Sequence, residues 1–189
     1  MKKVMVFFAF VLVLSLSQLP AQGTENPAFK VIVNHFAARN FSNEQVSKAE
    51  LDLVIQAGVR APSAANRQPW HFTVVQDEAL AKQIIPQVNP GNVLIVVSAA
   101  GDGKTNGAAI LDCALATQSL YLAAQALGLG SRIYTGPIDN VNRSFKTILG
   151  LPNDHSAVAI VRIGRLPAGV DAVSSASARN EAGRMVSYK

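Results

Sequence analysis

The sequence contains a single cysteine and three histidines, which leaves little material for disulfides or metal sites. Cys113 has no partner for a disulfide within one chain, and its apolar helical surroundings predict a small buried residue rather than a nucleophile. His35, His71 and His155 are far apart and lack the short spacings typical of metal ligands. We therefore expect no disulfide and no metal site.

The residues that hydrolytic enzymes use are also missing. Ser63 and Ser131 lack the surroundings of a nucleophile elbow, and no paired carboxylates stand out. The stretch from Ser98 to Thr105 ends like a phosphate-binding loop, in Gly-Lys-Thr, but it has Ser98 where that loop needs its first glycine. An ordinary glycine-rich turn is the better interpretation, and an NTPase built on Lys104 is the weakest alternative.

The N-terminus is typical of a secretory signal peptide. Two lysines precede an apolar stretch from Val4 to Leu14, and a small-residue site follows at Ala21-Gln22-Gly23. The apolar part is shorter than the ~20 residues of a spanning helix, and we expect no later stretch that is both long and uncharged enough to span. These features predict a signal peptide at residues 1–23, a mature domain at residues 24–189, export to the periplasm and no membrane association after cleavage.

The remaining charge does not indicate a nucleic-acid partner. Residues 1–23 hold two of the 17 basic residues and none of the 12 acidic ones, so the mature chain keeps a mild basic excess. Its lysines and arginines are scattered singly rather than gathered on one helix. The length suits one well-buried domain and is short for two.

Local patterns predict alternating helices and strands. Ser47-Lys48-Ala49-Glu50 is a capping box that opens a helix from about Ser47 to Val59, and Pro62 places a loop after it. Asp139 is expected to cap a further short helix. The other expected elements are helices at Asp77–Ile85 and Ala108–Leu127 and strands at Trp70–Val75, Val93–Ser98 and Ala157–Gly164. This order indicates an α/β or α+β layer architecture.

Two further segments have a marked composition. The helix at Ala108–Leu127 carries a stripe of Leu111, Leu115, Gln118 and Leu122 with alanines around it, which predicts a buried helix. The stretch from Ala172 to Ala178 is rich in serine and alanine without an apolar period, so it is expected to lie on the surface as an arm.

One loop carries a specific motif. Ala61-Pro62-Ser63 follows the capped helix, Asn66 stands one residue before Gln68-Pro69-Trp70, and a strand begins there. Arg39-Asn40-Phe41 precedes the capping box, the long helix closes with the stretch from Leu122 to Ser131, and the last strand ends in Gly164. With these motifs in this order, the mature chain resembles the nitroreductase family of flavoproteins along nearly its whole length.

The resemblance implies a fold, a cofactor and an activity. It implies an α+β, three-layer sandwich with a central, mainly antiparallel sheet flanked by helices, in a homodimer that exchanges C-terminal arms. It also implies that FMN is bound at the dimer interface. The implied reaction transfers a hydride from NAD(P)H to a small acceptor such as a nitroaromatic or a quinone.

The resemblance assigns roles to particular residues. Arg39 matches the family's cation at the pyrimidine edge of the flavin, and Gly136 matches backbone near the reactive ring nitrogen, so both are expected to be catalytic. The residues expected to bind the cofactor are His35, Phe36, Ala37, Arg39, Pro62, Ser63, Asn66, Thr135, Gly136 and Arg179. Within this set, Pro62, Ser63 and Asn66 would lie along the ring, and Arg179 would hold the phosphate.

The sequence also departs from the family at the expected phosphate site. His35 and Ala37 stand where arginine and serine are typical, and Ser177 stands where a lysine is expected. Free NADH and NADPH are cytoplasmic, whereas this chain is expected to be exported. These points leave an alternative open: an exported protein of the same fold that binds flavin or another flat ligand without nicotinamide turnover.

Overall fold

A four-stranded antiparallel sheet lies at the centre of the computed structural model, which describes residues 26–101, 107–174 and 176–189. The strands occur in the spatial order β1-β2-β4-β3. Their bounds are β1 Trp70–Val75, β2 Val93–Ala100, β3 Gly130–Tyr134 and β4 His155–Gly164. The expected span of β1 is confirmed, whereas β2 and β4 are each two residues longer than predicted.

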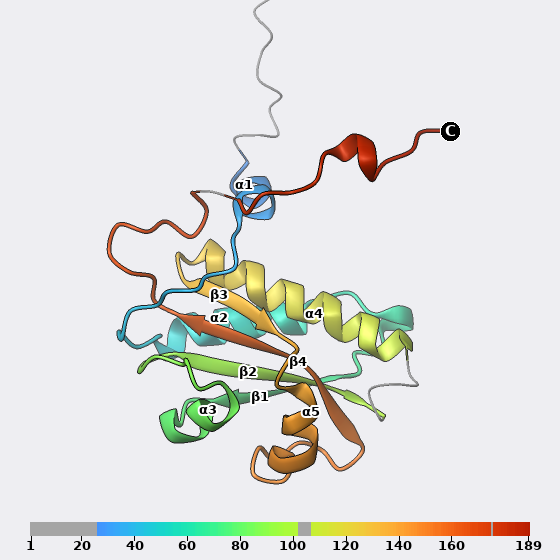
Figure 1. Ribbon diagram of the computed structural model, residues 1–189. Coiled ribbons are helices and arrows are strands. Elements are labelled where there is room, and N and C mark those ends of the chain that lie inside the picture. The colour runs from blue at the N-terminus through green and yellow to red at the C-terminus, as the bar shows by residue number, and fades with distance from the viewer. Residues whose placement is uncertain (1–25, 102–106, 175) are drawn as a thin grey trace, which may run out of the picture.

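Helices cover both faces of the sheet and make three layers (Figure 1). Helices α2 (Lys48–Val59) and α4 (Gly107–Ala126) lie on one face, and α3 (Glu78–Ile84) and α5 (Ile138–Asn140) lie on the other. A hydrophobic core lies on each face of the sheet, and alternate residues of β2 point into opposite cores. Ile95 and Val97 face α2 and α4, while Leu94 and Val96 face α3. The three-layer α+β sandwich is therefore confirmed.

Two short elements near the ends of the chain complete the described structure. Helix α1 (Pro27–Asn34) was not expected from the sequence; Asn26 caps it, yet none of its residues is buried. The C-terminal residues reach away from the body and include η3 (Ala182–Arg184) (Figure 1). Ala172 is buried, but the described residues from Ala176 onward are exposed, in line with an arm.

The orientation of α4 differs from the expected one. Leu111 and Leu115, which belong to the predicted apolar stripe, are 62% and 39% exposed. The buried face instead carries mostly small or polar side chains together with Leu120; its residues are Ala109, Asp112, Cys113, Ala116, Thr117, Leu120, Tyr121, Ala124 and Gln125. Alanines let the helix backbone lie close to the sheet, and Leu111 and Leu115 face outward.

Helix α4 also corrects the expectation that no stretch after the signal peptide could span a membrane. Among the helices of the described residues, only α4 has the length and the apolar composition to cross a membrane. In the fold it packs against the sheet and α2, and Gly58 of α2 approaches it so closely that a Cβ there would lie 2.6 Å from Leu120 Cδ2. The apolar composition of α4 thus serves the core of this domain.

The helix predicted after Asp139 is capped differently. Asp139 lies inside α5 and makes no capping bond, since Pro137 occupies the N-cap position. The chain continues as η2 (Val141–Phe145), a π-helical turn. Val141 is fully buried in the core on the α3 side of the sheet. Burial of this side chain, rather than the capping signal of Asp139, therefore sets the path of the turn.

The capping box of α2 also ties the helix to the end of β4. Ser47 accepts a hydrogen bond from the Glu50 amide, and the Ser47 amide donates to Glu50. Arg165 adds two contacts of 2.9 Å from its guanidinium to the two Glu50 carboxylate oxygens. Glu50 thus joins α2 to the strand that leads to the C-terminal segment.

Stability is expected to fall at acid pH because Glu50 must be ionised for these contacts. Burial raises the pKa of Glu50, but the bonds from Ser47 and the charge of Arg165 outweigh it and hold the pKa below 4.5. A carboxyl with a lowered pKa stabilises the fold above its ordinary pKa, and this contribution is lost as the pH falls through the folded-state pKa. Urea unfolding from about pH 7 to about pH 3 should therefore show a smaller loss of stability for Glu50→Gln than for the native chain.

Asp52 provides the matched control for this prediction. It pairs with Lys48, but both side chains are more than half exposed, so the pair contributes little. Asp52→Asn should follow the acid response of the native chain. An identical acid response of Glu50→Gln and the native chain would contradict the role given to Glu50.

Candidate functional site

The segment around Phe36 is held against the body by a side chain of α4. The buried Gln125 amide donates to the Phe36 carbonyl oxygen at 3.0 Å, and its Oε1 accepts from the Phe36 amide at 3.2 Å. Gln125 also donates to Ser131 Oγ, and the Ala38 amide donates to the Ser131 carbonyl. This pairing fixes the backbone just before Arg39.

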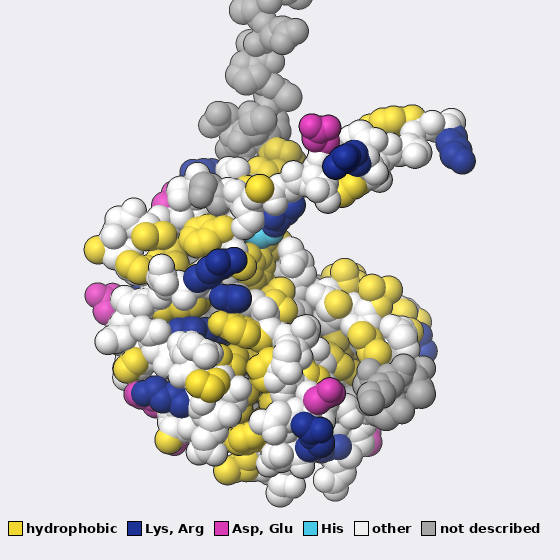
Figure 2. Space-filling model, viewed as in Figure 1, with side chains coloured by type: hydrophobic (Ala, Val, Ile, Leu, Met, Phe, Trp, Pro, Cys, Tyr) yellow, Lys and Arg dark blue, Asp and Glu magenta, His cyan; other side chains and the backbone are white. Residues whose placement is uncertain are grey.

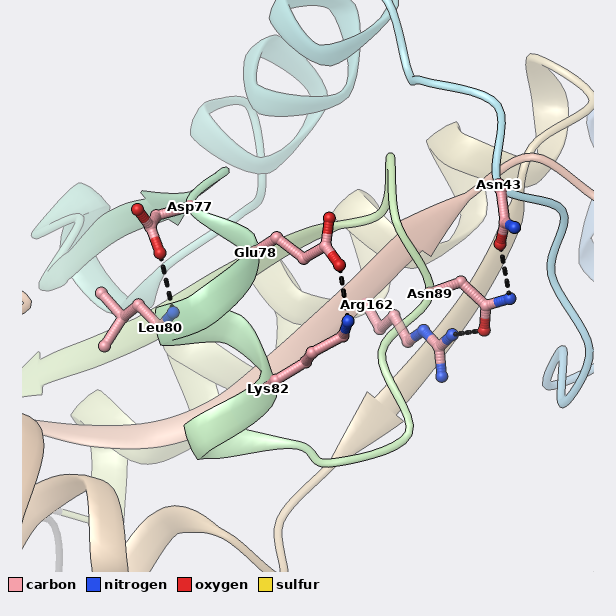
Figure 3. A network of polar contacts seen from close by, with 7 residues as sticks. All are labelled: Asn43, Asp77, Glu78, Leu80, Lys82, Asn89 and Arg162. Atoms are coloured by element: carbon pink, nitrogen blue, oxygen red, sulfur yellow. Dashed lines mark hydrogen bonds and ion pairs between the residues drawn. The ribbon is translucent and has the colours of Figure 1, made fainter.

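The backbone just after Arg39 is fixed by a buried arginine of β4. Arg162 is 1% exposed, and its guanidinium lies over the Phe41 ring at 4.1 Å. It donates from Nε to Asn92 Oδ1 at 2.7 Å and from Nη2 to Asn89 Oδ1 at 2.9 Å. Asn89 in turn contacts Asn43, as Figure 3 shows. Arg39 therefore lies between two anchored positions.

Arg39 borders a cavity of about 400 Å³. The lining comes from the segment near Arg39 and from the chain after β4: Phe36, Ala37, Arg39, Asn40, Leu166, Pro167, Val170, Ala176 and Ser177. Among the described residues, none accepts a hydrogen bond from the Arg39 guanidinium, and the side chain is exposed. Figure 2 shows the C-terminal arm standing clear of the body. A cation without a protein partner beside a cavity is suited to an anionic or electron-rich ligand.

His35, which stands at the expected phosphate site, lies beside Tyr121. The His35 ring lies edge-on to the Tyr121 ring at 5.4 Å. Burial raises the pKa of Tyr121, while a bond from Gln125 and the charge of Arg179 oppose that rise. His35 Nδ1 contacts the Ile32 carbonyl oxygen at 2.8 Å, and because a carbonyl only accepts, that nitrogen carries the proton. His35 Nε2 thus remains for another partner.

The loop with the Pro-Ser-Asn motif adopts an uncommon backbone. Ala65, Asn66 and Gln68 have φ values of 51°, 55° and 49°, in the left-handed region. Ser63 Oγ accepts from the Gln68 amide at 3.0 Å, and the Gln68 side chain donates to Asn66 Oδ1 at 3.1 Å. Non-glycine residues rarely adopt this conformation, so the shape of the loop is specified by its contacts.

One chain does not bring all the predicted residues together. The cavity beside Arg39 is lined by Phe36 and Ala37, but the lining does not include Pro62, Ser63, Asn66, Thr135 or Gly136. The motif loop contacts α4 at Asp112, whereas the Phe36 segment contacts α4 at Gln125. Thirteen residues of α-helix separate these contacts by about 20 Å. The motif loop and the Phe36 segment therefore lie apart within a protomer.

The polar residues of α4 that contact the motif loop and the segment around Phe36 were not predicted from the sequence. Asp112, Tyr121 and Gln125 are all at least 95% buried, and each contacts a residue in or near a predicted segment. Their signal was available in principle, since polar side chains in an alanine- and leucine-rich helix need buried partners.

The other candidate groups do not form a second site. Burial, and secondarily the charge of Asp112, raises the pKa of Cys113 to about 12, which confirms a buried thiol rather than a nucleophile. His71 and His155 lie 6.1 Å apart between ring centroids, but the described residues contain no group of three possible metal ligands. Lys104 and the end of the Gly-Lys-Thr stretch lie outside the described residues.

Known proteins match this chain in sequence and in fold. A protein of Archaeoglobus fulgidus, named "Putative NADH dehydrogenase/NAD(P)H nitroreductase", is 32% identical over 145 residues, which cover 71% of this chain and 83% of the relative. A nitroreductase of Desulfitobacterium hafniense with bound FMN superimposes with a TM-score of 0.72 at 23% identity, covering 87% of this chain and 98% of that one.

A second solved structure gives the same result. A nitroreductase of Bacteroides fragilis with bound FMN has a TM-score of 0.71 at 22% identity and covers 87% of this chain and 100% of that one. The model of the nitroreductase family matches residues 32–92 and 86–165, which include β1 to β4, Arg39 and the motif loop. The chain therefore belongs to the nitroreductase family.

Proposed function

We propose that this protein is an FMN-dependent oxidoreductase that transfers a hydride from NAD(P)H to a small acceptor such as a nitroaromatic or a quinone. Membership of the family and the name of the Archaeoglobus relative support this class of reaction. The solved structures that share the fold and are described with bound FMN support the cofactor.

The observation that carries the proposal is the Arg39 guanidinium, which has no hydrogen-bond partner among the described residues and borders a cavity of about 400 Å³. FMN has a flat ring system with one polar edge and an anionic phosphate. Arg39 suits the edge, while Arg179 suits the phosphate. The residues present therefore fit this cofactor.

Each group of residues has a separate task in the proposed reaction. When bound, FMN supplies the ring that accepts the hydride from the nicotinamide and passes its electrons to the acceptor. Arg39 stabilises the negative charge that develops at the polar edge of the ring. With FMN bound, the backbone at Thr135 and Gly136 and the loop containing Pro62, Ser63 and Asn66 would hold the ring, and the loop would limit access of water.

The proposed enzyme is a homodimer with the cofactor at its interface. The motif loop and the Phe36 segment are held about 20 Å apart in one protomer, so one ring cannot contact both unless a second protomer supplies one of them. The exposed Leu111 and Leu115 on α4 offer an apolar contact surface. The exposed C-terminal residues are available to cross to the partner as an exchanged arm.

The alternative function is an exported protein of the same fold that binds flavin, or another flat ligand, without nicotinamide turnover. Ala37 and Ser177 favour it, because both line the cavity and neither supplies the contact expected for phosphate at its position. The signal peptide at residues 1–23 and a periplasmic location, which we also propose, separate the protein from cytoplasmic NADH and NADPH.

Spectroscopy of the purified mature chain should distinguish these functions. The expected result is a yellow protein whose visible absorbance bleaches when NADH or NADPH is added without oxygen. Yellow protein that keeps its colour would support the binding function. A colourless protein that cannot be reconstituted with FMN would contradict both.

A further inference from the structure

Asp112 is a buried carboxylate of α4 that binds the backbone of the motif loop. It is 4% exposed, and its Oδ1 accepts a hydrogen bond from the Ala64 amide at 2.9 Å. Its charge contributes to the raised pKa of the neighbouring Cys113 thiol, although burial is the larger cause. An ionised acceptor makes a stronger bond to a backbone amide than a neutral one does.

The loop depends on such a bond because its own conformation is unfavourable. Non-glycine residues rarely adopt the left-handed region, and the loop contains Ala65, Asn66 and Gln68 in that region. The bonds of Ser63 and Gln68 stay within the loop. They shape the loop without attaching it to the domain.

Both backbone groups of Ala64 are hydrogen-bonded to side chains. Its amide donates to Asp112, and its carbonyl oxygen accepts from Arg67 Nε at 3.2 Å. Arg67 and Asp112 also border the same small cavity of about 60 Å³. Because Asp112 belongs to the core helix, its bond attaches the strained turn to the rigid part of the domain.

We propose that Asp112 is a positioning residue that holds Ser63 and Asn66 in the conformation that contacts the flavin. This inference rests on the proposed function. Asp112 is buried beneath the loop and acts through the Ala64 amide. Loss of a charge-assisted bond should weaken FMN binding by about tenfold to a hundredfold.

The test compares Asp112→Leu and Asp112→Asn with the native mature chain. Asp112→Leu removes the acceptor, whereas Asp112→Asn keeps a neutral acceptor and should restore part of the effect. FMN affinity is measured by fluorescence titration. Amide hydrogen exchange of residues 64–68 is measured without FMN and is expected to rise at least about tenfold in Asp112→Leu.

Thr117→Val is the matched control. Thr117 is also buried on α4, but its hydroxyl donates to the Cys113 carbonyl within the same helix. The control should lose stability without changing FMN affinity or the exchange of the loop. A merely structural role of Asp112 predicts that its variants behave like this control.

The outcomes separate this inference from the proposed function. Native-like loop exchange in a folded Asp112→Leu variant would overturn the positioning role. If Asp112→Leu does not fold, the test rests on Asp112→Asn. Native-like amide hydrogen exchange of residues 64–68 in that variant would overturn the positioning role. A native chain that fails to bind FMN would overturn the proposed function, while the exchange measurement would still decide whether Asp112 fixes the loop.

Discussion

Replacing Arg39 with alanine is expected to slow the reduction of the bound flavin by about a hundredfold or more while leaving the dimer intact. The guanidinium has no described protein partner and borders the cavity, so its loss should cost little stability. A fixed cation stabilises the negative charge that develops at the edge of the ring during hydride transfer. Stopped-flow absorbance with NADH or NADPH measures the rate, and light scattering measures the oligomeric state.

Arg39→Lys is the control because it keeps the charge and changes its geometry. It should retain more of the reduction rate than Arg39→Ala, although lysine cannot make the paired contacts of a guanidinium. Reduction by Arg39→Ala at the native rate would show that the cation lies elsewhere. Loss of the dimer in Arg39→Ala would show that the side chain is structural.

The elements predicted well are those whose signals lie within a few residues. The capping box at Ser47 and Glu50 opens α2 as expected, and the β-branched and aromatic run from Trp70 gives β1 its predicted bounds. Cys113 is buried as predicted. In each case the local preference and the tertiary packing agree.

The elements predicted poorly depend on contacts between distant residues. The orientation of α4 could not be read from its leucines, because small alanines decide which face fits the sheet. Asp139 has a good capping residue type, but burial of Val141 sets the path of the chain there. Helix α1 has a capping asparagine and yet buries none of its residues in one protomer.

The site was predictable as a set of residues but not as an arrangement. The motif placed Arg39 and Asn66 in the expected order along the chain. The partners of Asp112, Gln125 and Arg162 could not be predicted, because each contacts a segment at least 48 residues away. Buried polar partners of this kind follow from the packed fold rather than from local sequence.

Introducing aspartate at both Leu111 and Leu115 is expected to dissociate the proposed dimer and to release FMN. These side chains are one helical turn apart on the exposed stripe of α4, so both would face the same interface. A buried unpaired carboxylate costs about 3 kcal/mol or more, which weakens association more than a hundredfold. Sedimentation velocity measures the dimer, and the visible spectrum after gel filtration measures retained flavin.

Ile148→Asp is the matched control for the double variant. Ile148 is 65% exposed, close to the 62% of Leu111, but it lies in the turn after η2, beyond the opposite face of the sheet. Ile148→Asp should therefore leave both the proposed dimer and the visible absorbance of the retained flavin unchanged. Because the motif loop and the Phe36 segment are too far apart to share one ring within a protomer, dissociation and loss of flavin should occur together. A monomeric Leu111→Asp, Leu115→Asp variant that remains yellow would show that one chain builds the whole site.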